Sequence, residues 1–146
     1  MITYQKLTKE DIKQVVLLEE EFLGETLGEE MLTSELNNPA ASFITAKQDK
    51  VVLGYIGGYF IEEEGEILNF VVNEKYQRQG IGTALLTTLL SININTKKII
   101  LEVRENNQKG INFYTKFGFQ KISIRKHYYK NGDHAVVMMK EIQWKY

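Results

Sequence analysis

Two closely spaced glycines follow a predicted strand and precede a predicted helix, in the segment Gln77-Arg78-Gln79-Gly80-Ile81-Gly82. Glycine lets the backbone come close to a ligand, and the first N–H groups of a helix have no partner within that helix. The helix dipole adds partial positive charge at the same end, and Arg78 adds a full charge. The segment therefore predicts a phosphate-binding turn.

Other phosphate motifs fit this segment less well. A dinucleotide fingerprint would need a third glycine at position 85, where the chain has Leu85. A Walker loop would need Gly-Lys followed by Ser or Thr, which the segment lacks. The alternative to a phosphate site is that Gly80 and Gly82 only shape the turn between strand and helix.

Glu102 is a carboxylate in an otherwise apolar predicted strand, residues 98–104. A carboxylate in such a strand needs a partner or a chemical role. It can act as a general base, or it can form a salt bridge with a neighbour such as Arg104. Glu66, which opens the adjoining predicted strand, is a rival base.

Tyr114 lies seven residues after Asn107, about two helical turns, so both side chains can share one face of a predicted helix. An aromatic residue on a helix is more often part of the core. Tyr128-Tyr129 can line a peptide channel or pack between strands. Trp144 is expected to pack rather than to act chemically.

Alternating and helical hydrophobic periods predict the elements that position these residues. Their order is β-α-α-β-β-β-α-β-α-β-β, which indicates a single α/β (α+β) domain over residues 1–146. The predicted strands are 2–6, 42–47, 51–62, 66–73, 98–104, 119–125 and 135–142, and the predicted helices are 8–23, 29–37, 81–92 and 107–116.

Several local signals refine this outline. Thr8 and Asp11 have the spacing of a capping box, and Gly57-Gly58 predicts a bulge or a close backbone approach. Turns are predicted at residues 48–50 and 64–65. The predicted helix after the glycine turn has apolar residues at steps of four, four and three positions, namely Ile81, Leu85, Leu89 and Ile92.

Composition excludes several classes of protein. The chain has 146 residues, of which 43% are hydrophobic and 25% charged, as in one globular domain. No apolar run approaches the roughly 18 residues of a membrane span, and the start MITYQKL lacks an export signal. Zero Cys and two His leave little for disulfides or a metal centre, so we expect no metal and a cytoplasmic location.

The charge is divided unevenly along the chain. Residues 1–66 hold 14 acidic and 5 basic side chains, a net charge of −9, whereas residues 67–146 hold 5 acidic and 13 basic, a net charge of +8. Such asymmetry predicts two ligands of opposite sign. The alternative is that Glu-rich helices only solvate one half.

Taken together, the motifs resemble those of the GNAT superfamily of acetyltransferases, which bind acetyl-coenzyme A through a pyrophosphate loop like Gln77-x-x-Gly80-x-Gly82. Within that superfamily, residues 66–142 are most similar to the RimI type, which acetylates the N-terminal alanine of a small-subunit ribosomal protein. The further motifs that carry the resemblance are Leu101-Glu-Val-Arg104, Asn107, Phe113-Tyr114, Gly118-Phe119, Arg125 and Tyr128-Tyr129. The resemblance implies a mixed, mostly antiparallel sheet flanked by helices.

The resemblance also implies roles for individual residues. Glu102 would accept a proton, Tyr114 would donate one, and Asn107 would hydrogen-bond the cofactor. Backbone groups of Phe70, Val71 and Val72 would contact the pantetheine arm and the thioester carbonyl. The pyrophosphate would be cradled by Arg78, Gln79, Gly80, Ile81, Gly82 and Thr83. The chain departs from the pattern at Asn73-Glu74, where Asp-Pro is frequent, and at Lys130-Asn131, where proline is common.

The chemistry favours an N-terminal amine as the acceptor. At pH 7, deprotonating an α-amine (pKa about 7.8) costs about 1 kcal/mol, whereas a lysine amine (pKa about 10.4) costs about 4.6 kcal/mol. We therefore expect acetyl transfer to the N-terminus of a ribosomal protein by direct attack in a ternary complex, by a monomer or weak homodimer with no DNA or membrane partner. The alternatives are a small-molecule amine, a lysine side chain, and a non-catalytic acyl-coenzyme A binding module.

Overall fold

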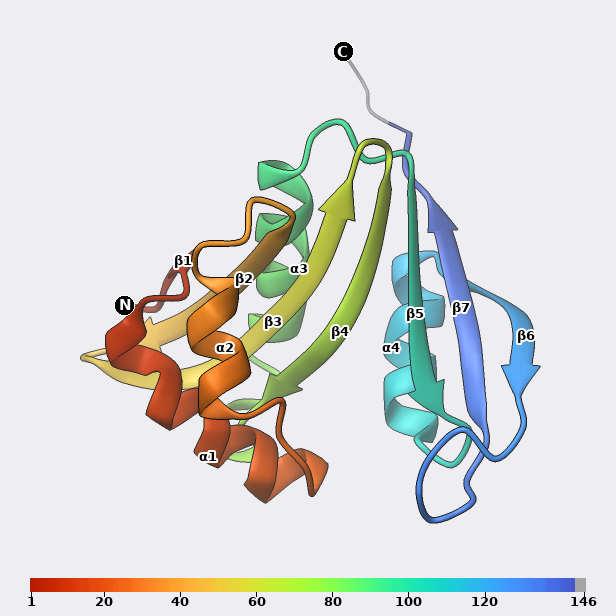
Figure 1. Cartoon of the computed structure of the whole chain (residues 1–146), viewed down its shortest axis with the longest axis horizontal. Helices are drawn as coiled ribbons and strands as arrows, with labels where there is room; N and C mark the ends of the chain where they lie inside the picture. The colour runs from red at the N-terminus through yellow and green to blue at the C-terminus, as the bar shows by residue number, and fades with distance from the viewer. Residues whose placement is uncertain (144–146) are drawn as a thin grey trace. The chain divides into compact units, whose positions relative to one another are not determined.

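The structure, a computed structural model, describes residues 1–143 and confirms the predicted order of strands and helices (Figure 1). The strands are β1 (Thr3–Lys6), β2 (Ala41–Gln48), β3 (Val51–Ile61), β4 (Glu64–Val72), β5 (Lys98–Arg104), β6 (Gln120–Arg125) and β7 (Ala135–Glu141). The helices are α1 (Ile12–Leu23), α2 (Glu29–Glu35), α3 (Ile81–Ile92) and α4 (Gln108–Phe117), with short 3-10 helices η1 (Lys9–Asp11) and η2 (Glu74–Tyr76). Trp144 lies outside the described residues.

The strands form a mixed sheet in the order β1-β2-β3-β4-β5-β7-β6. β4 and β5 are parallel, while the pairs β1–β2, β2–β3, β5–β7 and β6–β7 are antiparallel. This is the predicted fold class. The chain divides into two compact units, residues 1–60 with 69–94 and residues 61–68 with 95 onward, so β4 contributes to both. The single domain over residues 1–146 stays a prediction.

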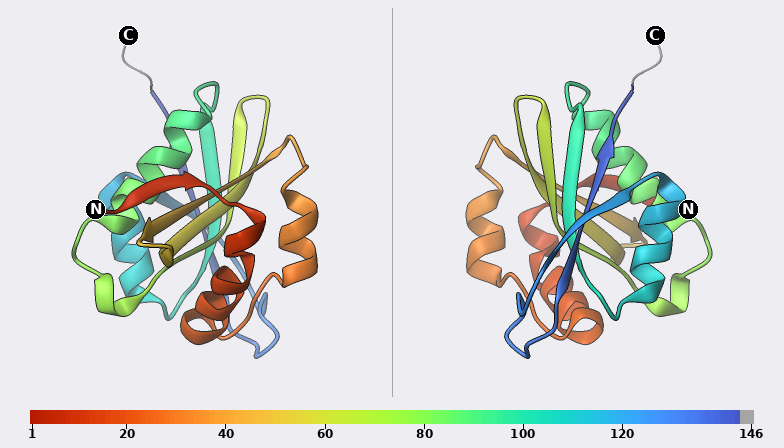
Figure 2. Two further views of the ribbon diagram at one scale, coloured as in Figure 1. Left: turned by 90° about the vertical axis from the view of Figure 1, so that its left-hand side faces the viewer. Right: turned by 90° about the vertical axis from the view of Figure 1, so that its right-hand side faces the viewer.

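Helices cover both faces of the strands in the first unit (Figure 2). Residues 52–58 of β3 are buried at every position, as expected for a strand with both faces covered. On one face, Asn93 at the end of α3 donates to the Ser42 hydroxyl of β2 (3.2 Å). On the other face, the Tyr59 hydroxyl of β3 donates to Glu35 of α2 (2.9 Å).

The second unit has one buried face and one more open face. Along β5, Ile99, Leu101 and Val103 are buried, whereas the alternate residues are not. Lys140 of β7 lies opposite Ile99, so its side chain is on the same face as Ile99. The Lys140 Nζ reaches Gly118, the C-cap of α4, where it lies 2.5 Å from the position that a Cβ atom would take. α4 therefore covers the buried face of β5.

Polar side chains replace the expected cap of the first helical turn. The Thr8 hydroxyl makes no hydrogen bond to a backbone N–H group but donates to the Asp11 carboxylate (3.0 Å). Asp11, which is 3% exposed, also forms an ion pair with Lys47 of β2 (2.9 Å). The prediction of a capping box is therefore wrong, because the carboxylate is used to neutralise a partly buried lysine.

Both predicted turns shift by one or two residues. The β2–β3 turn has only Asp49 and Lys50, both with positive φ, as in a two-residue hairpin loop. The β3–β4 turn lies at residues 62–63 rather than 64–65, because Glu62 adopts the positive φ (54°) and Gly65 is a buried strand residue.

Gly57 marks a close approach, and the bulge of this hairpin lies elsewhere. A side chain at Gly57 would begin 1.9 Å from a ring carbon of Phe43, the cross-strand partner. The register of β2 and β3 shifts instead between Ala46 and Lys47. At the end of α3, Ile92 is 41% exposed, whereas the apolar residues Ile81, Leu85 and Leu89 of the same helix are buried.

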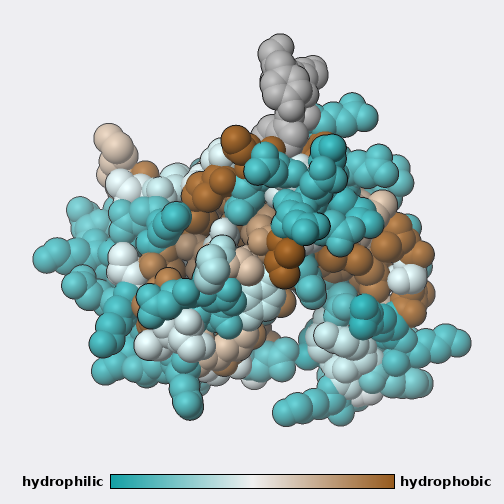
Figure 3. All heavy atoms as spheres, turned by 45° about the horizontal axis from the view of Figure 1, so that its top comes forward, coloured by the Kyte–Doolittle hydropathy of each residue, from teal (hydrophilic) through white to brown (hydrophobic). Residues whose placement is uncertain are grey.

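Most of the face shown in Figure 3 is hydrophilic. The exposed large apolar residues occur in several separate elements, and they are Met1, Leu17, Val51, Ile61, Ile92, Ile94, Ile122, Ile124 and Tyr128. Among residues 1–143, no helix is long and apolar enough to cross a membrane.

Candidate active site

The glycine turn is formed within the first unit and leads into α3. Gly80 is the N-cap of α3 with a φ of 77°, and its carbonyl accepts from the Ala84 N–H (3.0 Å). The N-cap residue makes no side-chain cap hydrogen bond, and a side chain at Gly80 would meet nothing within 4 Å. The first N–H groups of α3 have no partner within the helix, which is the arrangement that binds phosphate.

Arg78 has an unusual backbone conformation for a residue with a side chain. Its φ is 68°, in the left-handed region, and its side chain is exposed. This conformation costs a non-glycine residue about 1 kcal/mol. Such conformations cluster at functional sites, so the guanidinium beside the turn is consistent with anion binding.

The end of β4 packs tightly against β3 and α3. A side chain at Gly54 would begin 3.0 Å from the Val71 carbonyl oxygen and 3.3 Å from Leu85 of α3. Gly54 therefore lets the backbone of residues 70–72 lie close to β3. At its C-terminal end the strand is held by the Asn73 N–H, which donates to the Leu53 carbonyl (2.8 Å).

Glu102 lies in the second unit, on the face of β5 opposite the buried residues. Its side chain is 18% exposed and forms an ion pair with Arg125 of β6 (3.0 Å). Arg104, the partner considered from the sequence, pairs with Asp133 instead (3.3 Å). The carboxylate is thus held in place by a charged neighbour while part of it stays accessible.

A β-bulge brings Arg125 to Glu102, and sequence reasoning missed this contact. The β6–β7 register shifts between Lys121 and Ser123, which places Arg125 opposite Ala135. Ala135 and Val137 of β7 lie on the Glu102 face of the sheet. Without the extra residue, Arg125 would point to the other face, because a one-residue shift reverses every side chain.

Tyr128 lies close to Glu102 and Arg125. Its pKa is raised chiefly by a hydrogen bond to Glu102, then by burial and by the negative charge of Glu102, while Arg125 lowers it. The charge of Glu66 raises this pKa further, so both candidate bases act on Tyr128. The carboxylates of Glu66 and Glu102 therefore share one polar environment with Arg125.

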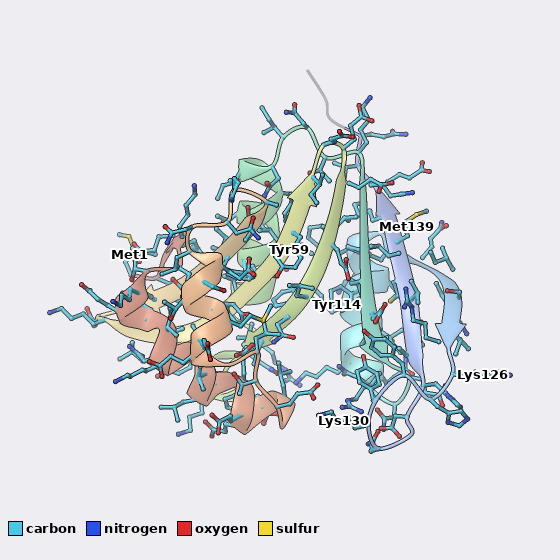
Figure 4. The ribbon with its side chains drawn as sticks, in the orientation of Figure 1. Met1, Tyr59, Tyr114, Lys126, Lys130 and Met139 are labelled. Carbon is cyan, nitrogen blue, oxygen red and sulfur yellow. The ribbon has the colours of Figure 1, made fainter. Side chains whose placement is uncertain are left out.

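Arg104 fixes the loop between β6 and β7, residues 126–134. Its guanidinium lies 3.9 Å from the ring centre of Tyr129 and donates to Asn131 (3.2 Å). Within the loop, the His127 N–H donates to Nδ1 of His134 (2.9 Å). The histidines thus have a structural role, whereas Lys126 and Lys130 are exposed and extend outward (Figure 4).

Asn107 and Tyr114 both lie at α4, as predicted. Asn107 is the N-cap, and its side-chain oxygen accepts from the Gly110 N–H (2.9 Å), so its side-chain NH2 group is the part that can donate to a ligand. Tyr114 is 9% exposed and packs edge-on against Phe113 and Phe119, with ring centres 5.5 Å apart in each case. Burial, with a smaller effect of Tyr129, raises the pKa of Tyr114, which keeps its hydroxyl protonated.

Glu102 and Tyr114 lie on two elements of the second unit, β5 and α4. Glu102 points away from the face of Ile99, Leu101 and Val103, and α4 covers that face. The second unit therefore holds both a carboxylate that can accept a proton and a protonated phenol that can donate one.

The profile of the acetyltransferase (GNAT) family matches residues 12–119. The chain belongs to this family. It is an N-acetyltransferase, and the fold and family predicted from the sequence are confirmed.

Some relatives of this chain are named N-alpha-acetyltransferases, and others are named ribosomal-protein-alanine N-acetyltransferases. An N-alpha-acetyltransferase of Sulfurisphaera tokodaii is 31% identical, covering 88% of this chain and 86% of the relative. A [ribosomal protein bS18]-alanine N-acetyltransferase of Haemophilus ducreyi is 33% identical, over 70% of this chain and 77% of the relative. The crystal structure of the ribosomal-protein-S18-alanine N-acetyltransferase from Escherichia coli is 25% identical, with a TM-score of 0.88 and coverage of 100% and 97%.

Structural neighbours of this GNAT fold have been solved with coenzyme A or acetyl-coenzyme A. The uncapped start of α3 and the charge of Arg78 fit the diphosphate of such a ligand. The residues predicted to contact it divide between the units: Phe70 to Thr83 lie in the first, and Asn107 lies in the second with Glu102 and Tyr114. Among residues 1–143, no group of three or more His, Asp or Glu side chains could hold a metal ion.

Replacing Arg78 with Gly separates its charge from its backbone conformation. Gly adopts positive φ without strain but adds unfolded-state entropy, so we expect the free energy of unfolding to change by less than about 0.5 kcal/mol. Loss of a charge-assisted contact to phosphate should raise the Kd for acetyl-coenzyme A about tenfold. Calorimetric titration and thermal melting measure the two effects, and an unchanged Kd would exclude Arg78 from the ligand.

Proposed function

We propose that this GNAT protein transfers the acetyl group of acetyl-coenzyme A to the N-terminal α-amine of a ribosomal protein whose first residue is alanine. The names of the Haemophilus ducreyi and Escherichia coli relatives support the ribosomal substrate, and the Sulfurisphaera tokodaii relative supports an α-amine more generally. The lower cost of deprotonating an α-amine at pH 7 points to the same acceptor. The protein acts as a monomer or weak homodimer.

The first unit supplies the contacts to acetyl-coenzyme A. Backbone groups of Phe70, Val71 and Val72 contact the pantetheine arm and the thioester carbonyl. The diphosphate is bound by Arg78, Gln79, Gly80, Ile81, Gly82 and Thr83 at the start of α3. Backbone N–H groups near the thioester carbonyl stabilise the negative charge that develops on its oxygen. Asn107 of the second unit adds a side-chain amide contact.

The second unit supplies proton transfer. Glu102 removes a proton from the ammonium group, directly or through a water molecule, and the neutral amine attacks the thioester carbon. The new C–N bond forms, and the C–S bond then breaks while the Tyr114 hydroxyl donates its proton to the departing sulfur. The second proton lost by the nitrogen passes through water and restores the Tyr114 hydroxyl. The observation that supports this assignment is the Glu102 carboxylate, which is partly accessible and is held 3.0 Å from Arg125.

A substrate panel tests the proposed acceptor. We expect the highest kcat/KM for a basic peptide that begins with alanine and copies the N-terminus of a small-subunit ribosomal protein. The same peptide with a blocked N-terminus, which still offers lysine amines, should lose at least about 10²-fold, since a lysine amine costs roughly 3.6 kcal/mol more to deprotonate. Equal or faster acetylation of polyamines or other small amines would contradict the proposal, and no acetylation of any amine would indicate a binding module.

A further inference from the structure

A buried carboxylate in the first unit has no part in the proton transfers described above. Glu19 of α1 is 0% exposed. A buried carboxylate is unfavourable unless hydrogen bonds satisfy it. Its two oxygens accept from neutral donors: the Thr26 hydroxyl (2.7 Å) and the side-chain amide of Asn69. Glu19 thus joins two segments that are 43 residues apart in the sequence.

The first of these segments is the connection between α1 and α2. It is bounded by Gly24 and Gly28, which have φ values of 76° and 94°. Thr26 lies between them, and its hydroxyl donates to Glu19 and accepts from the Gly28 N–H (3.0 Å). The Thr26 hydroxyl therefore anchors an exposed loop to a buried charge.

The second segment is the end of β4. Asn69 immediately precedes residues 70–72, the backbone proposed to contact the thioester. Its side chain is held by the Glu19 carboxylate of α1. Beyond residues 70–72, the Asn73 N–H donates to the Leu53 carbonyl of β3 (2.8 Å). The backbone of residues 70–72 thus lies between two held positions, one of which depends on the carboxylate of Glu19.

A third polar group lies in the same cluster. The Tyr55 hydroxyl of β3 is buried and, among the described residues, has no hydrogen-bond partner of acceptable geometry. Burial, and then the charge of Glu19, raise the pKa of Tyr55, so this hydroxyl stays protonated beside the carboxylate. The cluster is therefore one charge surrounded by protonated, neutral groups, an arrangement sensitive to the loss of any donor.

We propose that Glu19 is a positioning residue that couples the α1–α2 loop to the backbone of residues 70–72 through Thr26 and Asn69. This inference rests on the proposed function only for the role of residues 70–72 in binding acetyl-coenzyme A. By linkage, whatever orders the loop changes affinity for that ligand, because the Thr26 hydroxyl and the Asn69 side chain of β4 bind the same carboxylate.

The test uses Thr26→Val, which removes the hydroxyl and keeps the shape of an exposed loop residue. We expect it to raise the Kd for acetyl-coenzyme A about fivefold and to speed amide exchange at residues 69–73 of the ligand-free protein. Thr26→Ser keeps the donor and should restore both values. Tyr59→Phe, the matched control, removes a hydroxyl contact between β3 and Glu35 and should leave both within twofold.

A double-mutant cycle then shows whether the effect passes through Glu19. In an Asn69→Ala background, Thr26→Val should change the Kd by less than twofold. Unchanged binding and unchanged exchange in Thr26→Val alone would overturn the proposal, whether or not the Asn69 variant folds. If the wild-type protein fails to bind acetyl-coenzyme A while Thr26→Val still speeds exchange at residues 69–73, the coupling is supported and the proposed function is what fails.

Discussion

Replacing Glu102 with Gln is expected to lower kcat/KM by about 10²- to 10⁴-fold, the range for loss of a general base. Gln keeps an acceptor oxygen for Arg125 and occupies the same space as Glu, so the positions of residue 102 and Arg125 should be retained. Because the Arg125 side chain is 55% exposed, losing its ion pair should lower the free energy of unfolding by less than about 1 kcal/mol. Steady-state kinetics with the alanine-starting peptide, together with thermal melting, measure these effects.

Glu66→Gln is the matched control for this prediction. Glu66 is the rival base, it is exposed, and its charge also acts on Tyr128. We expect it to lower kcat/KM less than about threefold. A larger loss from Glu66→Gln than from Glu102→Gln would move the base to Glu66 and contradict the assignment.

Tyr114→Phe is expected to lower kcat about 10- to 100-fold while leaving the Kd for acetyl-coenzyme A within about twofold. The loss corresponds to one hydrogen bond to a charged group, about 1.5–3 kcal/mol. Phe keeps the edge-on contacts with Phe113 and Phe119, so folding should be preserved. Single-turnover rates and calorimetric titration separate the two quantities.

The pH dependence gives a second measure of Tyr114. Because burial raises the pKa of Tyr114 above the ordinary value of about 10, its hydroxyl stays protonated through neutral and mildly alkaline solution. Ionisation of Tyr114 should therefore cause no fall of kcat below about pH 10.

Tyr4→Phe, in β1, is the control for loss of a phenol. An equal loss of kcat in Tyr4→Phe and Tyr114→Phe would remove the special role of Tyr114.

The fold was predictable because its elements have strong local signals. β5 matched its prediction at both ends, since its apolar run ends in charged residues at Lys98 and Arg104. Turns were predicted less well. The positive φ of Glu62 and the buried position of Gly65 depend on how β4 pairs with β5, and no local pattern encodes that pairing.

The candidate site was predictable in its motifs and not in its contacts. Residues of the glycine turn are adjacent in the sequence, so their shared location could be read directly. The pair of Glu102 and Arg125 depends on a β-bulge near Ile122, which reverses the direction of Arg125. The link from Glu19 to Asn69 joins a helix to a strand 50 residues away, and an α1 pattern dominated by apolar and acidic residues gives no sign of it.

The two units of the structure differ less in net charge than the two halves of the sequence do. The first unit holds 11 acidic and 7 basic residues, a net charge of −4, and the second holds 8 and 11, a net charge of +3. The difference arises because residues 61–68, with four acidic side chains, belong to the second unit, and residues 69–94, with a net charge of +1, belong to the first. In the second unit, Glu63 and Glu64 pair with Lys97 and Lys98 (3.2 Å each). The glycine turn that we propose to bind phosphate lies in the acidic unit, so in this proposal the local positive charge comes from Arg78 and the start of α3.

Locating the acetyl group on a reaction product tests the central claim most directly. The purified protein would be incubated with acetyl-coenzyme A and a basic small-subunit ribosomal protein that has a free N-terminal alanine, and the product would be sequenced by tandem mass spectrometry. We expect one acetyl group on the α-nitrogen of the alanine, and none with the Glu102→Gln variant over the same time. Acetyl groups found only on lysine side chains, or none on the ribosomal protein, would contradict the proposed function.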